Sequence, residues 1–266
     1  MRSRTAVSPQ VVHEAIRREG EDELARPAAA LFWSAIAAGL SMGFSLVGEG
    51  ILRAALPDAP WRPLVAKLGY SLGFLFVVLG RQQLFTENTL LVILPFLARP
   101  RAGGLWRVAR VWGLVLAGNV CGALAFAGSL TLGAVASPEL HRAFSEIGQR
   151  ALSPGVGGVL VRAIYGGWLI ALMVWLLPAA VNARFFVIVA VTWLVGAGEF
   201  SHSIAGSVEV LYLVVTGQVG PGTFLGGFLL PALVGNSIGG VALVAALNHA
   251  QVVAGHEREA EDGTRH

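Results

Sequence analysis

One histidine of this sequence, His202, stands where a chemically active group is expected. It lies in a polar interruption, Glu199 to Ser203, between two apolar runs. Histidine changes charge near neutral pH, and ionisable groups within membrane-spanning segments usually serve function. We predict that His202 donates a proton to a passing solute or binds an anion. A packing histidine that is hydrogen-bonded to irregular backbone is the structural alternative.

A second polar interruption, Arg81 to Asn88, lies between two further apolar runs. Thr86 and Asn88 are side chains in it that can hydrogen-bond a solute. The same residue types cap helices and bond to freed backbone groups, so a purely structural role is the alternative. Because cap positions also expose N–H groups that attract anions, one residue can do both. Leu84 and Phe85 precede Thr86 and belong to the same candidate pore segment.

Four charged residues lie within or beside these apolar runs: Arg81, Glu87, Glu199 and Glu209. Charges are costly in lipid, and they are normally paired or functional there. Arg81 and Glu199 are 118 positions apart, at nearly equivalent places in the two interruptions. We predict that these two residues form a structural ion pair, the alternative being direct contact with a solute.

The remaining motif inventory is empty. No P-loop, zinc-protease helix, nucleophile elbow or metal-spaced set of cysteines and histidines occurs in the sequence. The single cysteine, Cys121, excludes a disulfide within the chain and is expected to be a small core residue. We therefore predict that the protein is not an enzyme and that it uses no cofactor or metal.

The composition indicates that lipid is the solvent for most of the chain. Of 266 residues, 55% are hydrophobic and 13% are charged, whereas soluble domains carry about 25% charged residues. The mean hydropathy is +0.68. A membrane helix needs about 20 apolar residues. Four uncharged runs meet that length and are assigned to spans one, three, four and six: 28–48, 111–138, 163–183 and 221–248.

The two interrupted regions, 68–98 and 185–216, supply spans two and five. Neither half of either region is expected to cross the membrane alone. Irregular backbone survives at membrane depth only where protein covers it or where it lines a cavity. Two broken spans therefore predict a solute site near the middle of the membrane.

A repeated motif relates the two halves of the chain. Gly118-Asn119-Val120-Cys121-Gly122 and Gly235-Asn236-Ser237-Ile238-Gly239 lie 117 positions apart, as do Phe85 and His202 in the two interruptions. We predict two three-span repeats, which an odd number of spans places in opposite orientations. Thr86 and His202 should then meet near the centre. The small residues of the two motifs are expected to pack one repeat against the other.

Charge predicts that both termini are cytoplasmic. In that orientation the cytoplasmic side holds twelve arginines and the other side six basic residues, as the positive-inside rule requires. The same bias explains a pI near 9.6 without a nucleic-acid partner. Residues 1–27 are assigned to a cytoplasmic segment with a short amphipathic helix, capped at Ser8-Pro9, on the membrane surface. Residues 28–250 form the channel domain and 251–266 a cytoplasmic tail.

The sequence resembles the formate/nitrite transporter family over roughly residues 28–250. The matching motifs are Leu84-Phe85-Thr86, His202-Ser203-Ile204-Ala205, Gly118-Asn119 with Gly122-Ala123-Leu124, and Gly235-Asn236 with Ile238-Gly239-Gly240. The resemblance implies a homopentamer of all-helical, aquaporin-like protomers, each with its own pore. Within the pore it implies Thr86, His202 and hydrophobic constrictions on both sides of the histidine: Tyr70, Phe74, Leu84, Val174 and Val195.

Three family positions differ in this chain. The usual Gly-Phe-Glu-His is here Glu199-Phe200-Ser201-His202, so Ser201 replaces the glutamate beside the histidine. Gly206 replaces the asparagine that follows His-Ser-Ile-Ala, and Ala171 replaces the pore asparagine of span four. A divergent branch of the family is indicated, and the resemblance does not fix the solute.

The predicted function is a channel or proton-linked transporter for a small monovalent weak-acid anion, formate-like or nitrite-like, in a bacterial-type plasma membrane. A channel for a neutral small solute is the alternative within the same class, favoured by the loss of the pore asparagine. A non-conducting scaffold or sensor with the same fold is the alternative from another class.

Overall fold

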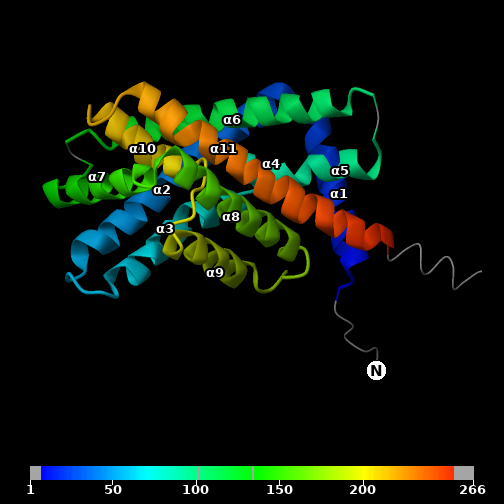
Figure 1. The fold of residues 1–266 in the computed structure, drawn as a ribbon, viewed down its shortest axis with the longest axis horizontal. Helices are drawn as coiled ribbons and strands as arrows, with labels where there is room; N and C mark the ends of the chain where they lie inside the picture. The colour runs from blue at the N-terminus through cyan, green and yellow to red at the C-terminus, as the bar shows by residue number, and fades with distance from the viewer. Residues whose placement is uncertain (1–6, 101, 134, 255–266) are drawn as a thin grey trace, which may run out of the picture.

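The chain is all-helical in the computed structural model, which describes residues 7–254 apart from 101 and 134. Helix α1 (Pro9–Ala25) and helix α7 (Pro138–Leu152) lie toward opposite ends of the long axis of the molecule (Figure 1). We call these ends the α1 side and the α7 side. The expected tail lies outside the described residues from 255 onward.

Five helices in the described part of the chain are long and apolar enough to cross a membrane. They are α2 (Ala28–Ala55), α3 (Arg62–Leu79), α6 (Gly104–Ser129), α8 (Gly155–Leu176) and a C-terminal helix over Thr223–Ala254. Two π-helical stretches, η1 (Thr223–Leu229) and η2 (Ile238–Ala246), flank α11 (Leu230–Ser237) in the last of these. All four uncharged runs fall largely within these helices, although α6 and α8 begin and end earlier than predicted.

The expectation that no half of an interrupted span crosses alone is wrong for α3. This helix has 18 residues because it begins at Arg62, before the uncharged run, and includes Lys67. The Lys67 ammonium lies 2.7 Å from a carboxylate oxygen of Glu49 on α2, and this ion pair allows a charge within an apolar helix. In the second interrupted span, α9 (Arg184–Ala197) and α10 (Ala205–Val215) are both short, as predicted.

Both interrupted spans contain the same reverse turn. After α3, Arg81 adopts a left-handed φ of 51°, and the N–H of Gln82 donates to the carbonyl of Val77 at 3.0 Å. After α9, Glu199 adopts the same φ, and the equivalent bond is 2.9 Å. This is the Schellman arrangement that ends helices. The first span continues with α4 (Phe85–Leu91) and α5 (Ile93–Ala98), and the second with α10.

The predicted ion pair between Arg81 and Glu199 is wrong. Arg81 pairs with Glu19 of α1 at 2.8 Å, and Glu199 pairs with Arg162 at 2.9 Å and Arg150 at 3.6 Å. The equivalence of the two positions is correct, since both occupy the same place in the same turn. Inverted repeats exchange the two faces of the membrane, so equivalent residues lie at opposite mouths and cannot touch.

An asparagine side chain holds the first interruption open. Asn119 of α6 accepts a hydrogen bond from the N–H of Phe85 at 2.9 Å. Its amide nitrogen donates to the carbonyls of Ala35 and Gln83, each at 2.8 Å. One fully buried side chain thereby satisfies three backbone groups on two other segments. Since an unsatisfied buried backbone group is costly, this asparagine makes the broken helix possible.

Asn236 of α11 does the same for the second interruption. It accepts from the N–H of Ser203 at 2.8 Å and donates to the carbonyls of Ala163 at 2.7 Å and Ser201 at 3.0 Å. We call the two sets of three bonds the asparagine clamps. The asparagines are 117 positions apart, but the residues that they bond in the two breaks are 118 apart, as Phe85 and Ser203 show. The structural counterpart of His202 is therefore Leu84, one residue before the counterpart predicted from the motif.

The glycines of the two motifs pack helices within each repeat, not one repeat against the other as predicted. A Cβ on Gly118 would lie 2.6 Å from the Cβ of Ala35 in α2. A Cβ on Gly239 would lie 2.1 Å from the carbonyl oxygen of Ile164 in α8. Close approach of α2 to α6, and of α8 to the C-terminal helix, brings each clamp within reach of its break.

Helix α1 begins after Ser8, whose side chain accepts a hydrogen bond from the N–H of Val11 at 3.4 Å. The sequence suggested that this helix lies on the membrane surface. In the structure its apolar face packs against other helices of the protein instead. Residues such as Ile16 and Leu24 are buried, and α1 contacts α4, α5, α6 and α8. The helix α7 was not predicted, although Ser137-Pro138 begins it with the same kind of cap.

Removing either clamp should destabilise the protein strongly. Asn119→Ala or Asn236→Ala leaves two buried backbone groups of the break, one N–H and one C=O, without these partners, which we expect to lower the free energy of unfolding by about 2–4 kcal/mol. Thermal unfolding in mild detergent measures this loss. Asn182→Ala, in an exposed loop, is the matched control and should melt like the unmodified protein. Equal melting of all variants would refute the clamp as the basis of the fold.

Candidate functional site

Thr86 and His202 meet in the interior, one from each interrupted span. The Thr86 hydroxyl oxygen and His202 Nε2 are 2.7 Å apart, and both side chains are buried. The other ring nitrogen, Nδ1, accepts hydrogen bonds from the N–H groups of Ala205 at 3.1 Å and Ile204 at 3.3 Å. Because Nδ1 is an acceptor, the neutral ring carries its proton on Nε2. His202 therefore donates, and the Thr86 oxygen accepts.

Two aromatic residues of α3 cover this pair. The ring of Phe74 meets the imidazole of His202 edge to face at a centroid distance of 4.9 Å. Tyr70 lies one turn earlier, 5.4 Å from Phe74. Phe74 is fully buried. The polar pair is thus packed against an apolar ring, an environment that strips water from any solute that reaches it.

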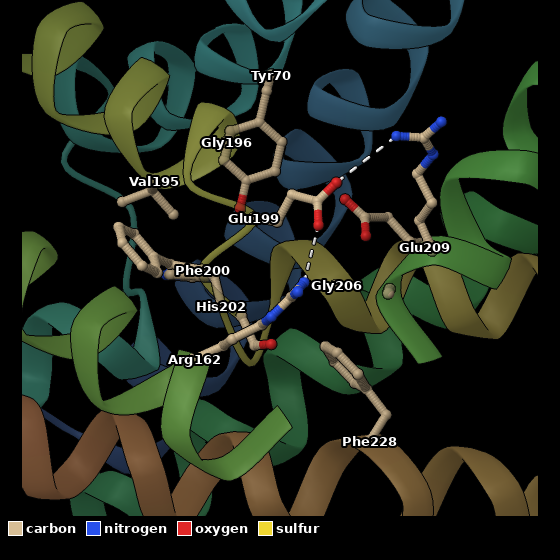
Figure 2. Close-up of a pocket in the computed structure, with 13 residues that line it drawn as sticks. Tyr70, Arg162, Val195, Gly196, Glu199, Phe200, His202, Gly206, Glu209 and Phe228 are labelled. Carbon is tan, nitrogen blue, oxygen red and sulfur yellow. Dashed lines mark hydrogen bonds and ion pairs between the residues drawn. The ribbon is translucent and has the colours of Figure 1, made fainter. Parts of the chain in front are cut away.

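The α7-side cavity opens onto His202 (Figure 2). Four predicted pore residues line it: Tyr70, Val195, Ser201 and His202. The wall also contains four charged side chains: Arg150, Arg162, Glu199 and Glu209. Figure 2 shows Arg162 beside Glu199, 2.9 Å away. Arg150 lies 3.6 Å from the other oxygen of the same carboxylate, so three of these charges are bound to one another.

The α1-side cavity is larger and ends before the central pair. Its volume is about 1180 Å³, against about 450 Å³ for the α7-side cavity. It is lined by Val174, Gln83 and Glu87, and by charged residues at its mouth: Glu19, Glu23, Arg26, Arg81 and Arg184. Thr86, Leu84 and Phe74 line neither cavity and are fully buried. An apolar layer therefore separates the α1-side cavity from the polar pair.

Two of the predicted pore residues, Phe85 and Asn88, make contacts that support the first interruption. The ring of Phe85 packs against Trp112 of α6 at 5.8 Å and lines neither cavity. The Asn88 amide donates to the Gln83 side chain at 3.0 Å and to the carbonyl of Leu84 at 3.1 Å. Asn88 therefore braces the first interruption, whereas Thr86 places its hydroxyl on His202.

Sequence reasoning missed several residues of the α7-side cavity. Phe200 was visible only as part of the family motif, and Arg150 and Arg162 carry no sequence signal because they lie on α7 and α8, outside the interruptions. Phe228 lines the same cavity from η1 and packs over Gly206. A Cβ on Gly206 would lie 2.1 Å from that ring, so the space of the usual family asparagine is filled by an aromatic ring. No group of residues suited to a metal ion occurs in the described part of the chain.

Restoring a side chain at Gly206 should disturb this packing. We expect Gly206→Ala to lower the free energy of unfolding by about 1–3 kcal/mol through overpacking, and the additional change Phe228→Ala to offset the overlap. Thermal unfolding of the single variants and the double variant measures the coupling. Gly113→Ala is the control, because no atom lies within 4 Å of its added Cβ. Additive losses in the double variant would contradict the contact.

Comparison with known proteins agrees with this architecture. A family model described as formate/nitrite transporter matches residues 10–250. The inner membrane protein YfdC of Escherichia coli (strain K12) is 44% identical over 241 residues, covering 91% of this chain and 78% of that protein. The uncharacterized transporter YrhG of Bacillus subtilis (strain 168) is 29% identical over 224 residues, 80% of this chain and 79% of that protein.

Solved structures match the fold. A pentameric formate channel with formate bound superposes with a TM-score of 0.70 at 22% identity, over 83% of this chain and 95% of that chain. An ion channel of the same family gives a TM-score of 0.68 at 18% identity, over 90% of this chain and 96% of that chain. The predicted all-helical, aquaporin-like fold is confirmed. Members of the matching family are transporters and channels rather than enzymes. Because the family model matches residues 10–250 and the Escherichia coli relative is 44% identical over 91% of the chain, this chain belongs to the formate/nitrite transporter family.

Proposed function

We propose that the protein conducts a small monovalent weak-acid anion, or its conjugate acid, past Thr86 and His202. The supporting observation is the hydrogen-bonded pair itself: two polar groups from opposite repeats, buried in an apolar layer between two charged cavities. A solute that passes must replace the bond between them. A formate-like or nitrite-like anion offers oxygen atoms that accept a bond from His202 Nε2.

The energetics favour crossing in the neutral form. A bare anion that enters a dry layer loses several kcal/mol of hydration even after relaxation, in line with the cost of burying charges in proteins. Protonating an acid of pKa about 4 at pH 7 costs roughly 4 kcal/mol. Because the two costs are similar, a small additional stabilisation decides whether the anion or the neutral acid crosses. A hydrogen-bond donor and a nearby proton source together favour the neutral acid.

His202 suits the role of donor better than that of proton source, which was the sequence hypothesis. Its Nδ1 is occupied by two backbone N–H groups, so a second ring proton has no acceptor there. The neutral ring can still donate from Nε2 to the solute, while the Thr86 hydroxyl turns to accept or donate. The proton for a weak acid must then come from another group.

The setting is proposed from charge and from the relatives. The α1 side, with most of the arginines, would face the cytoplasm. The inner membrane assigned by name to the Escherichia coli relative suits a multi-pass chain of this kind. A homopentamer is proposed because a structure of the same fold is described as a pentameric channel.

Flux into liposomes tests the proposed solute. Formate, nitrite, acetate, lactate and hydrosulfide, together with glycerol as a neutral solute, are offered at two pH values. His202→Phe removes the hydrogen bond to the solute, and we expect it to assemble normally but to lose weak-acid uptake by about tenfold or more. His202→Asn, which keeps a side-chain N–H donor, should retain part of the pH-dependent uptake, and Thr86→Ser, which keeps the hydroxyl, should retain flux.

Unchanged pH-dependent flux in both histidine variants would reduce His202 to a support of the broken helix. Flux of neutral solutes alone would favour the alternative channel. No flux of any solute would favour a scaffold.

Native mass spectrometry in mild detergent tests the assembly. Apolar side chains such as Trp33 and Leu105 are exposed on the outer surface, which is typical of a surface that contacts lipid or another subunit. We expect a pentamer to be the dominant species. Monomers or trimers alone, under conditions in which a known pentameric channel stays intact, would exclude it.

A further inference from the structure

The α7-side cavity is lined by two carboxyl groups, and that of Glu209, unlike that of Glu199, has no ion-pair partner among the residues that the structure describes. It projects from α10 into the space that His202 and Tyr70 also line (Figure 2). The residue is 8% exposed. Within the described part of the chain it makes no hydrogen bond and no ion pair. A buried, unpaired carboxyl group at membrane depth is costly, which points to function.

The charges around Glu209 leave one carboxyl group in excess. Lys67 is the cation that acts on it most strongly, and Glu49 is the nearby anion. The Lys67 ammonium, however, is already bound to both oxygens of Glu49, at 2.7 and 2.8 Å. It also lies 5.5 Å from the ring centre of Tyr70. One lysine thus serves two carboxyl groups, and the cluster is neutral only when one of them is protonated.

The other elements that pack on α10 do not supply the missing charge. On α2, Arg53 is bound to Glu146 of α7 at 3.0 Å. Arg150 of α7, together with Arg162, is bound to Glu199. His141 of α7 bonds to Tyr212 at 2.6 Å. The arginines of α6, Arg107 and Arg110, are near its start, and η1 contains no charged residue.

We propose, on the basis of the proposed function, that Glu209 is the proton-binding group of this transporter. Its carboxylate takes a proton from hydronium on the α7 side and gives that proton to a weak-acid anion in the cavity. The neutral acid then moves on to His202 and Thr86. Glu209 lies outside the family motifs that the sequence matches, the nearest of which ends at Ala205.

The transfer is balanced within the cavity. The O–H bond of protonated Glu209 breaks, and an O–H bond forms on a carboxylate or nitrite oxygen of the solute. Glu209 is left as a carboxylate, which regains its proton from hydronium on the α7 side. Until it does, the cluster with Lys67 and Glu49 is negative and repels the next anion. One proton therefore crosses with each anion, and His202 stays neutral throughout.

Proton uptake measured together with formate uptake tests this role. Proteoliposomes that contain a pH-sensitive dye are given an inward formate gradient at pH 7. Glu209→Gln keeps the shape of the side chain but cannot release a proton, and we expect acidification to fall by about a hundredfold, the low end of general acid catalysis. Glu209→Asp should retain part of the rate. Glu139→Gln is the matched control, because Glu139 is an exposed carboxyl group on the same side, paired with Arg142.

Infrared spectroscopy detects proton binding by Glu209 without any transported solute, so its result does not depend on whether the protein conducts a weak acid. Infrared difference spectra between pH 5 and pH 8 should show the carbonyl bands of protonated buried carboxyl groups in the unmodified protein and in Glu139→Gln. A second carboxyl group, that of Glu87, has a buried oxygen without a hydrogen-bond partner in the part of the chain that the structure describes, so its contribution is identified by its loss in Glu87→Gln. The Glu209 band should be absent from Glu209→Gln and shifted in Glu209→Asp.

Acidification by Glu209→Gln at the unmodified rate would overturn the inference and leave the proposed function standing. If the unmodified protein moves no weak acid, the proposed function fails, and the infrared band alone decides whether Glu209 binds a proton. Should Glu209→Gln not assemble, an unshifted band in Glu209→Asp would overturn the inference.

Discussion

The structure depends on satisfying backbone hydrogen bonds where two membrane helices are broken. Lipid offers no partners for N–H and C=O groups, so each break must be bonded by protein. Asn119 and Asn236 do this with three bonds apiece. Close packing at Gly118 and Gly239 brings the helices near enough for those bonds. Only because both breaks are held open in this way can Thr86 and His202 meet in the interior.

The inverted repeat makes the backbones of the two halves equivalent, but the side chains at equivalent positions differ. Leu84 and His202 occupy equivalent places, and so do Arg81 and Glu199. One clamp therefore presents an apolar side chain at the centre and the other a histidine, while the same turn carries Arg81 at one mouth and Glu199 at the other. A pore built this way has one polar point with an apolar layer on one side of it. The difference between the two sides of the pore thus comes from the side chains and not from the backbone, which is the same in both repeats.

Much of the fold follows from the sequence because lipid imposes simple rules. Uncharged runs, the polar breaks and the recurring Gly-Asn motif predicted the helices, the repeat and the meeting of Thr86 with His202. The partners of Arg81, Glu199 and Phe85 could not be predicted in the same way. Each partner depends on whether the side chain points to a mouth, to a neighbouring helix or into the pore. The asparagine motifs repeat at 117 residues but the breaks at 118, and this shift of one residue changes the direction in which a side chain points. The length of α3 was missed because the Lys67–Glu49 pair hides a charge inside an apolar helix.

We propose that conduction depends on a neutral His202 that meets the solute through Nε2. Solid-state NMR of ¹⁵N-labelled histidine in lipid bilayers tests this, with the His202 signals assigned by their loss in His202→Asn. We expect a protonated Nε2 and an unprotonated Nδ1 at pH 6, and a formate-dependent shift confined to Nε2. Protons on both ring nitrogens, or signals indifferent to formate while formate crosses the membrane, would contradict it.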